Sequence, residues 1–315
     1  MAKTLNTRTA IIDLGTNTFN LLIAEKSESC YQPIFKTKIP VNLGKGGFHK
    51  NILSEDAFDR GLKALATHKN TINAYKATST HAFATSAVRS ASNGKEFAEK
   101  AMSLTGIKIN IISGDYEAEL IYKGVTQALK LKEKNSLIMD IGGGSTEFII
   151  ANKNGIQWKH SFDLGVSRLL AKNTFSDPIS TEEISSLQNF LDRELVTLLN
   201  ACQKYPVNEL IGSSGSFESI SDIIDAAEEK DKELKKETEV VFGYEQLCKV
   251  IQQIITSTKE ERENLNGLVP FRINTIVVAS IIIHHIMEAY SLKDIRLSRY
   301  ALREGVLGLI FDNMQ

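Results

Sequence analysis

Two segments of the chain place an aspartate directly before a turn of glycine and small polar residues. The first covers residues 11–18, with Asp13 ending an apolar run, and the second covers residues 138–146, with Asp140 in the same position. Glycine and small hydroxyl residues let backbone N–H groups approach an anion closely. A carboxylate beside such a turn also suits Mg²⁺, which takes one or two carboxylates together with substrate phosphates.

The two segments therefore predict a phosphate clamp in which Asp13 and Asp140 hold or orient Mg²⁺. The alternative is a pair of β-hairpins with glycine-rich turns and no ligand. Because the pattern occurs twice, each time after an aspartate, it favours the clamp. The predicted phosphate-binding residues of the two turns are Gly15, Thr16, Asn17, Thr18, Gly142, Gly143, Gly144, Ser145 and Thr146.

Four further features have chemistry that suits a phosphate. Glu117 lies at the start of a predicted helix, where a carboxylate near polyanionic phosphate should have a raised pKa that suits a general base. The helix dipole alone would also favour a glutamate there. Arg89 carries a guanidinium that can fork onto phosphate oxygens, although a lone arginine after a strand is usually a surface residue. A basic loop at 44–47 could touch phosphate or be an ordinary hairpin loop.

The loop Ser213, Ser214, Gly215 follows a predicted strand and precedes a helix. Its N–H groups could bind an anion, or it could be a plain helix cap, and the sequence leaves both interpretations open.

Strand-like and helix-like runs alternate along the chain, which predicts an α/β fold. The pattern restarts after about one domain length, so two lobes on similar sheets are expected. Strands are predicted at 8–13, 19–25, 77–85, 107–112, 137–140, 146–151, 156–164, 209–212 and 295–298. Helices are predicted at 54–75, 94–105, 115–131, within 244–290, at 301–311, and from a capping box at 180–183 to about 204.

Composition narrows the functional classes. The 315 residues carry a formal net charge of −1, whereas general nucleic-acid binding needs a basic excess. Three isolated cysteines predict reduced thiols and, with no signal-peptide pattern, a cytoplasmic location without membrane or nucleic-acid partners. The apolar stretch 273–287 is too short to span a bilayer and predicts a buried helix. Six histidines form no ligand set, and the charge run 228–239 suggests a solvated helix face or loop.

The paired turns resemble the phosphate-binding loops of the actin, Hsp70 and sugar-kinase superfamily. More narrowly, the chain resembles the exopolyphosphatase/guanosine pentaphosphate phosphatase (Ppx/GppA) family, with motifs in that family's order along nearly the whole chain. The matching segments are 12–19, 84–91 with Asn93, 112–118, 140–147, 163–168 and 213–216.

The resemblance implies two ribonuclease H-like lobes with an active-site cleft between them, one of residues 1–124 joined by a returning helix at 300–315, the other of residues 125–299. It implies that Glu117 activates the attacking water, that Arg89 contacts phosphate, and that Mg²⁺ is the cofactor. The substrate would be inorganic polyphosphate or guanosine pentaphosphate, and a homodimer is plausible. Phosphotransfer to a small metabolite, as in acetate or sugar kinases, and a non-catalytic alarmone or polyphosphate sensor are the alternatives.

Two departures from the family bear on the substrate. Asn20 stands where family members often carry arginine, so one phosphate contact should be weaker. The chain ends at Gln315 without the extra helical region of longer relatives, so less processive action on long polyphosphate is expected.

Overall fold

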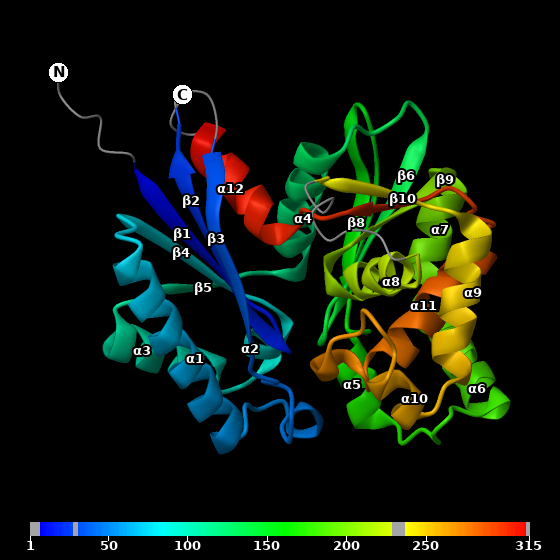
Figure 1. Ribbon diagram of the computed structural model, residues 1–315, viewed down its shortest axis with the longest axis horizontal. Helices are drawn as coiled ribbons and strands as arrows, with labels where there is room; N and C mark the ends of the chain where they lie inside the picture. Colours follow the sequence, from blue (N-terminus) through cyan, green and yellow to red (C-terminus); the bar gives the residue numbers. More distant parts are fainter. Residues whose placement is uncertain (1–6, 28–30, 229–236, 313–315) are drawn as a thin grey trace.

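Two α/β lobes lie side by side in the computed structural model, which describes residues 7–27, 31–228 and 237–312 (Figure 1). Within these described residues the first sheet has five strands and the second has six. The α/β class and the two-lobed arrangement expected from the sequence are confirmed.

The first sheet has the strand order β3-β2-β1-β4-β5. β1, β2 and β3 form an antiparallel meander, and β4 and β5 run parallel to β1. Both faces of β1 are buried, which explains why its sequence is a nearly continuous apolar run. The strands are β1 (Arg8–Leu14), β2 (Thr18–Lys26), β3 (Tyr31–Pro40), β4 (Ser79–Ala84) and β5 (Ile109–Ile111).

The second sheet repeats this order as β8-β7-β6-β9-β11 and adds β10 as an antiparallel edge strand. The repetition explains the echo in the sequence, because each Asp-Gly segment forms the turn of its lobe's first hairpin. The strands are β6 (Asn135–Ile141), β7 (Thr146–Asn152), β8 (Gly155–Phe162), β9 (Val207–Ser213), β10 (Glu239–Phe242) and β11 (Ile295–Ser298).

Two helices, α4 (Gly114–Ala128) and α12 (Leu302–Asp312), lie between the two sheets (Figure 1). One buried cluster joins Ile11 of the first sheet, the apolar sides of both helices, and Ile138 of the second sheet. Because α4 and α12 pack in a core common to both sheets, the division of the chain at residue 124 stays a prediction.

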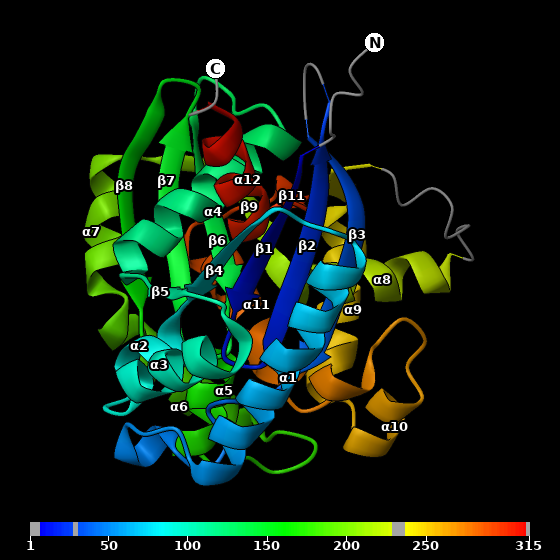
Figure 2. The same ribbon diagram turned by 90° about the vertical axis from the view of Figure 1, so that its left-hand side faces the viewer.

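The outer face of the first sheet is covered by α1 (Glu55–Ala74) and α3 (Gly94–Thr105), with the short α2 (Ser86–Ser90) after β4. Figure 2 shows α1 lying across this face. α1 begins at Ser54, whose hydroxyl accepts a hydrogen bond from the Ala57 N–H, as expected for an N-cap.

Helices also cover the outer face of the second sheet, and the central one, α11, is buried along most of its length. The core helix expected near 273–287 is thus confirmed. Among the residues described, no helix has both the length and the apolar character that crossing a bilayer requires. The helical elements between β8 and β11 are α5 (Val166–Lys172), α6 (Thr181–Glu194), α7 (Val196–Lys204), α8 (Ser214–Ala227), α9 (Tyr244–Thr256), α10 (Lys259–Glu263), the 3₁₀ turn η3 (Pro270–Arg272) and α11 (Ile276–Ala289).

Two sequence expectations need correction. The capping box of Ser180 and Glu183 forms, but the helix that it opens breaks at Leu195 into α6 and α7. The break leaves the spacing of buried leucines regular, so the pattern could not reveal it. Strands β3 and β10 were not expected. Both lie at sheet edges, β3 carries many polar residues, and β10 has only four residues. Most of the charge run 228–239 lies outside the described residues.

The contact between α4 and α12 depends on two glycines. A Cβ atom on Gly305 would lie 1.9 Å from the Leu120 carbonyl oxygen, and one on Gly124 would lie 1.9 Å from the Ala301 carbonyl oxygen. Backbone therefore packs directly on backbone here, and neither position has room for a side chain.

We predict that Gly305→Ala destabilises the protein, although alanine favours helix. Overpacking against the α4 backbone should cost about 1–3 kcal/mol, seen as a lower midpoint in thermal or urea unfolding. Gly243→Ala is the matched control, because its nearest neighbouring atom would be 3.8 Å from the new Cβ. Equal midpoints for both variants would contradict the close packing of α4 on α12.

Candidate active site

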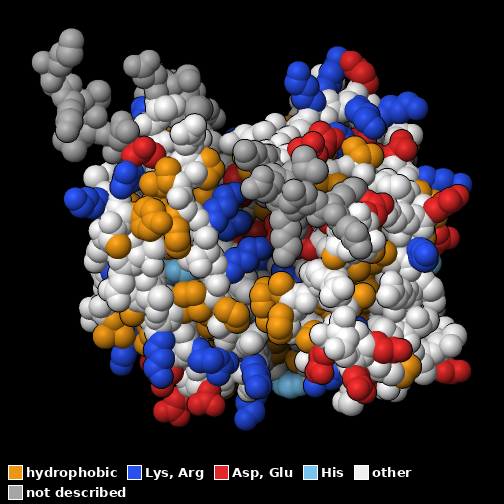
Figure 3. All heavy atoms as spheres, in the orientation of Figure 1, with side chains coloured by type: hydrophobic (Ala, Val, Ile, Leu, Met, Phe, Trp, Pro, Cys, Tyr) orange, Lys and Arg blue, Asp and Glu red, His pale blue; other side chains and the backbone are white. Residues whose placement is uncertain are grey.

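A cavity of about 120 Å³ lies between the lobes and is lined by both Asp-Gly turns. In the space-filling view, lysine and arginine side chains gather in the hollow at the centre of the molecule (Figure 3). The cavity brings together thirteen of the sixteen predicted site residues. They are Asp13, Gly15, Thr16, Asn17, Thr18, Glu117, Asp140, Gly142, Gly143, Gly144, Ser145, Ser214 and Gly215.

The two turns have the same backbone construction. The Gly15 N–H donates to the Thr18 carbonyl oxygen at 3.1 Å, and the Gly142 N–H donates to the Ser145 carbonyl oxygen at 2.9 Å. Both turns close antiparallel hairpins, and both line the same cavity. The hairpin and the clamp considered from the sequence are therefore compatible descriptions of one structure.

The turns also touch each other across the cleft. A Cβ atom on Gly144 would lie 2.5 Å from Ser86 Oγ and 2.7 Å from Thr16 Oγ1. Ser167 Oγ donates to Asn17 Oδ1 at 2.7 Å, which adds a hydrogen bond between the lobes. Only glycine at this point allows the second turn to approach the first.

A further link between the lobes comes from Arg168 of α5. Its Nε donates to the Gly144 carbonyl oxygen at 2.8 Å, and its Nη2 donates to Ser86 Oγ at 3.3 Å. The guanidinium also lies 4.9 Å from the centroid of the Phe48 ring. Arg168 thereby holds the second turn against α2 of the first lobe.

The two predicted metal ligands lie near the ends of corresponding strands, Asp13 on β1 and Asp140 on β6. Asp13 Oδ2 accepts a hydrogen bond from Asn20 Nδ2 at 3.0 Å, and Asp140 Oδ2 accepts one from Ser213 Oγ at 2.7 Å. Burial raises the pKa of Asp13 to about 6, with Arg303 acting in the opposite direction, and burial also raises the pKa of Asp140. Burial therefore disfavours the ionised form of both carboxylates.

Glu117 lies in the first turn of α4, which begins at Ser113. Its carboxylate is buried, and its Oε2 accepts from Arg89 Nη1 at 2.7 Å. Burial first, and the negative charge of Glu147 second, raise the pKa of Glu117 well above its ordinary value, while Arg89 opposes the shift. A buried carboxylate with a raised pKa at a cavity wall suits a general base.

Glu147 is a site residue that the sequence analysis gave no role. It pairs with Asp140 across the β6–β7 ladder, and its Oε1 accepts from Ser161 Oγ at 2.6 Å. Burial, together with the charge of Asp140, raises its pKa to about 7. Glu147 is the last residue of the segment 140–147, which resembles a family motif. Pairing the two strands of that hairpin would have placed Glu147 opposite Asp140.

Three predicted site residues do not line the cavity. Thr146 matches Phe19 when the two turns are superimposed by sequence, and its buried hydroxyl donates to the Leu164 carbonyl oxygen. Ser213 is buried and orients Asp140 through its hydroxyl. Arg89 reaches the site only through its contact with Glu117. Thr146 and Ser213 therefore make their side-chain contacts inside the second lobe, and their binding of phosphate stays a prediction.

Cations enter the cavity from segments without a recognisable motif. Arg272 of η3 lies against Gly215, where a Cβ atom would be 1.7 Å from Arg272 Nη2. Arg299 and Arg303 also line the cavity, and in the described structure Arg299 Nε is a buried donor without a hydrogen-bond partner. Buried donors of this kind need an acceptor, which an anionic ligand would supply.

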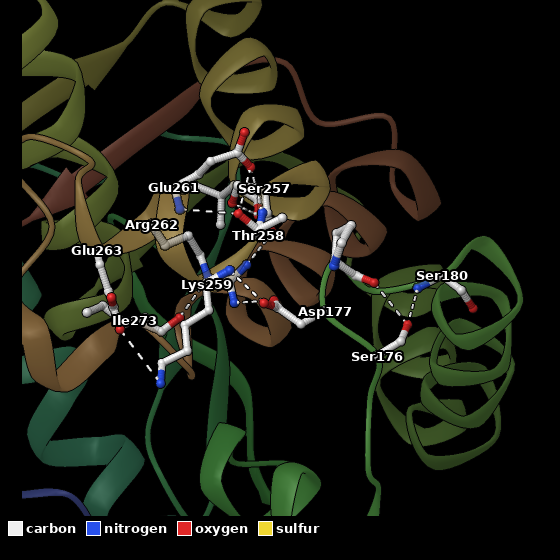
Figure 4. Close-up of polar contacts among 12 residues, drawn as sticks. Ser176, Asp177, Ser180, Ser257, Thr258, Lys259, Glu261, Arg262, Glu263 and Ile273 are labelled. Carbon is white, nitrogen blue, oxygen red and sulfur yellow. Dashed lines mark hydrogen bonds and ion pairs between the residues drawn. The ribbon is translucent and has the colours of Figure 1, made fainter.

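Figure 4 shows the polar contacts that hold Ile273, the residue after Arg272. Arg262 Nε donates to the Ile273 carbonyl oxygen at 3.0 Å, and its Nη2 contacts Asp177 Oδ1 at 2.7 Å. Asp177 Oδ2 in turn accepts from the Lys259 N–H at 2.6 Å. Because Ile273 directly follows Arg272, this network fixes the point from which Arg272 reaches the cavity.

The acids of the cavity fit Mg²⁺ by their chemistry. No group of three or more histidine, cysteine, aspartate or glutamate side chains within the described residues is arranged to hold a metal alone. Mg²⁺, however, normally takes one or two carboxylates and completes its shell with water and substrate phosphate. Asp13, Asp140 and Glu147, each with a pKa raised by burial, provide such oxygen donors.

Two ribonuclease H-like lobes with a cleft between facing glycine turns define a member of the actin, Hsp70 and sugar-kinase superfamily. The sequence profile of the Ppx/GppA phosphatase family matches residues 22–313, and the chain belongs to that family.

Its relatives agree with this assignment. An exopolyphosphatase crystal structure from Cytophaga hutchinsonii is 36% identical, with a TM-score of 0.95 and 98% of each chain covered. A Haemophilus influenzae relative whose name contains exopolyphosphatase is 27% identical over 97% of this chain and 92% of its own length. A guanosine-5'-triphosphate,3'-diphosphate pyrophosphatase of Pseudoalteromonas atlantica is also 27% identical, and this chain spans 59% of it.

We predict that Glu147 makes the free protein less stable as pH rises. A carboxyl group whose folded pKa is raised from 4.5 to about 7 stabilises the fold below pH 4.5, and this contribution is lost as pH rises through 7. Between pH 5 and pH 8 the free energy of unfolding of Glu147→Gln should therefore rise relative to that of the unsubstituted protein, by on the order of 1–3 kcal/mol.

The control for this experiment is Glu119→Gln, because Glu119 is partly exposed and pairs with Lys159. The variant reports the effect of removing one negative charge outside the cavity. A stability difference for Glu147→Gln that does not change with pH would contradict the raised pKa.

Proposed function

We propose that this protein removes the terminal phosphate of inorganic polyphosphate, of guanosine pentaphosphate, or of both. The observation that carries the proposal is the pair of facing glycine turns, with the buried Glu117 on the wall of the same cavity. The family membership supports hydrolysis of a phosphate ester or anhydride bond, and the names of the relatives suggest the two substrates.

The size of the cavity supports cleavage at the end of the chain. A volume of about 120 Å³ is well below the roughly 300–1,000 Å³ of pockets that enclose a whole drug-sized ligand. Only the terminal part of a phosphate chain fits, and the remainder must leave along the interlobe hollow. Polyphosphate and guanosine pentaphosphate both end in such a phosphoanhydride, which is why the cavity alone does not separate them.

In the proposed reaction the N–H groups of the turns after Asp13 and Asp140 hold the terminal phosphate oxygens. Glu117 takes a proton from a water molecule, whose oxygen bonds to the terminal phosphorus in line with the anhydride bond. That bond breaks, the bridging oxygen stays on the shortened chain, and phosphate is released. Arg89 holds the Glu117 carboxylate in place and favours its ionised form.

Asp140, helped by Asp13 and Glu147, would hold Mg²⁺ beside the phosphate. The ion, when bound, offsets negative charge on the phosphate oxygens. The charge of the ion would also lower the raised pKa values of the surrounding acids, so metal and substrate should bind cooperatively. The cytoplasmic location and the homodimer stay predictions, and none of the contacts described bears on them.

We predict that Glu117→Gln lowers kcat for phosphate release by roughly 10²–10⁴-fold, because the amide cannot accept the proton from water. Phosphate release from polyphosphate and from guanosine pentaphosphate should be measured side by side. Glu119→Gln, two residues further along α4, should retain activity. Unchanged release by Glu117→Gln would remove this glutamate from the mechanism, and phosphate transfer to an added metabolite in place of free phosphate would indicate a kinase.

We also predict that Asp140→Asn raises the Mg²⁺ concentration needed for half-maximal activity, by roughly 10-fold or more, because a ligand charge is lost. The measurement is a Mg²⁺ titration of phosphate release at fixed substrate. Asp115→Asn, an exposed acid at the start of α4, serves as the control. An unchanged Mg²⁺ requirement would contradict the role of Asp140.

A further inference from the structure

Corresponding rows of side chains cross the first three strands of each lobe at the cavity. In the second lobe the row is Asp140, Glu147 and Ser161, which are paired across β6, β7 and β8. In the first lobe the equivalent row is Asp13, Asn20 and Lys38, paired across β1, β2 and β3. The row in the second lobe contains two acids, whereas the row in the first lobe ends in the cation Lys38.

Lys38 is the cation of this wall. Among the described residues that line the cavity, no other lysine or arginine precedes residue 135. Its strand neighbour Asn20 is neutral, and the Asn20 amide already donates to Asp13. Among the described strands of the first sheet, Lys38 is therefore the source of positive charge at this wall.

Lys38 forms an ion pair with an acid of the opposite lobe. Its Nζ lies 2.7 Å from Oε2 of Glu218 on α8. Burial alone would raise the pKa of Glu218, but Lys38, then Arg303 and Arg272, hold it below its ordinary value. An ionised carboxylate therefore occupies a place among cations at the cavity wall, where a substrate phosphate would also be attracted.

We propose that Lys38 binds a substrate phosphate that follows the terminal one, and that it leaves Glu218 to do so. The inference rests on the proposed function and names a substrate-binding residue for it. Lysine suits this exchange, because it is a compact charge on a flexible stem, and 40% of this side chain is exposed. Arg272 and Arg303 remain beside Glu218 and keep its charge offset after Lys38 moves.

If Lys38 exchanges partners, substitutions of Lys38 and of Glu218 should have opposite effects on substrate binding, which a purely structural ion pair would not give. Lys38→Met removes a phosphate contact, so the Kd and KM for tripolyphosphate should rise roughly 10- to 100-fold with little change in kcat. Glu218→Gln frees Lys38, so the same constants should fall. A structural pair would instead give both variants the same loss of affinity and of lobe closure.

The Kd should be measured by titrating tripolyphosphate into proteins that also carry Glu117→Gln, so that binding is read without turnover. A failure of the proposed hydrolysis would then leave this test intact. Lys36→Met is the matched control, because Lys36 lies on the same strand, pairs with Glu304 and does not line the cavity. Its Kd should stay within about threefold of that of the parent protein.

Two combined variants complete the test. The affinity gained by Glu218→Gln should disappear in a Lys38→Met background, because the gain acts through the lysine. Asn20→Arg should restore part of the affinity of Lys38→Met, since it places a cation directly across the β2–β3 ladder. The proposal is overturned if Lys38→Met binds tripolyphosphate as tightly as Lys36→Met, or if Glu218→Gln weakens binding as much as Lys38→Met does.

Discussion

The contact between the two glycine turns is the constraint on which the site depends. Gly144 meets Thr16 and Ser86 so closely that an added methyl group would force these side chains to shift. Hydrogen bonds from Ser167 to Asn17 and from Arg168 to Ser86 cross between the lobes at the same point. Because the turns meet there, two hairpins separated by about one domain length of sequence can present their N–H groups to one cavity, and the acids that precede them lie near each other.

The second consequence of this closeness is electrostatic. Asp13, Glu117, Asp140 and Glu147 are brought together at one cavity, and burial raises the pKa of each of them. An arrangement of this kind is unfavourable without positive charge, and it becomes favourable when Mg²⁺ and a phosphate chain bind together. The cations Arg272, Arg299 and Arg303 line the same cavity and complement the substrate. The fold therefore keeps acids for metal and base chemistry near cations for phosphate.

Sequence alone predicted the parts of the site that lie next to a motif. Asp13, Asp140 and Glu117 could be found because each sits in a short pattern with its own chemical meaning. Thr146 and Ser213 belong to the same motifs, but their side chains make contacts inside the second lobe, which the motifs alone did not reveal. Lys38, Glu218 and Arg272 could not be found, since β3, α8 and η3 meet only in the folded protein. The break at Leu195 escaped for a similar reason, because the buried pattern runs through it.

The most direct test of the central claim is a crystal structure of Glu117→Gln with Mg²⁺ and tripolyphosphate. The account predicts that N–H groups from residues 15–18 and 142–145 both lie within hydrogen-bond distance of the same terminal phosphate. It also predicts that Asp140 is among the residues that hold Mg²⁺ beside that phosphate. A terminal phosphate that contacts one turn alone, or that lies outside the interlobe cavity, would contradict it.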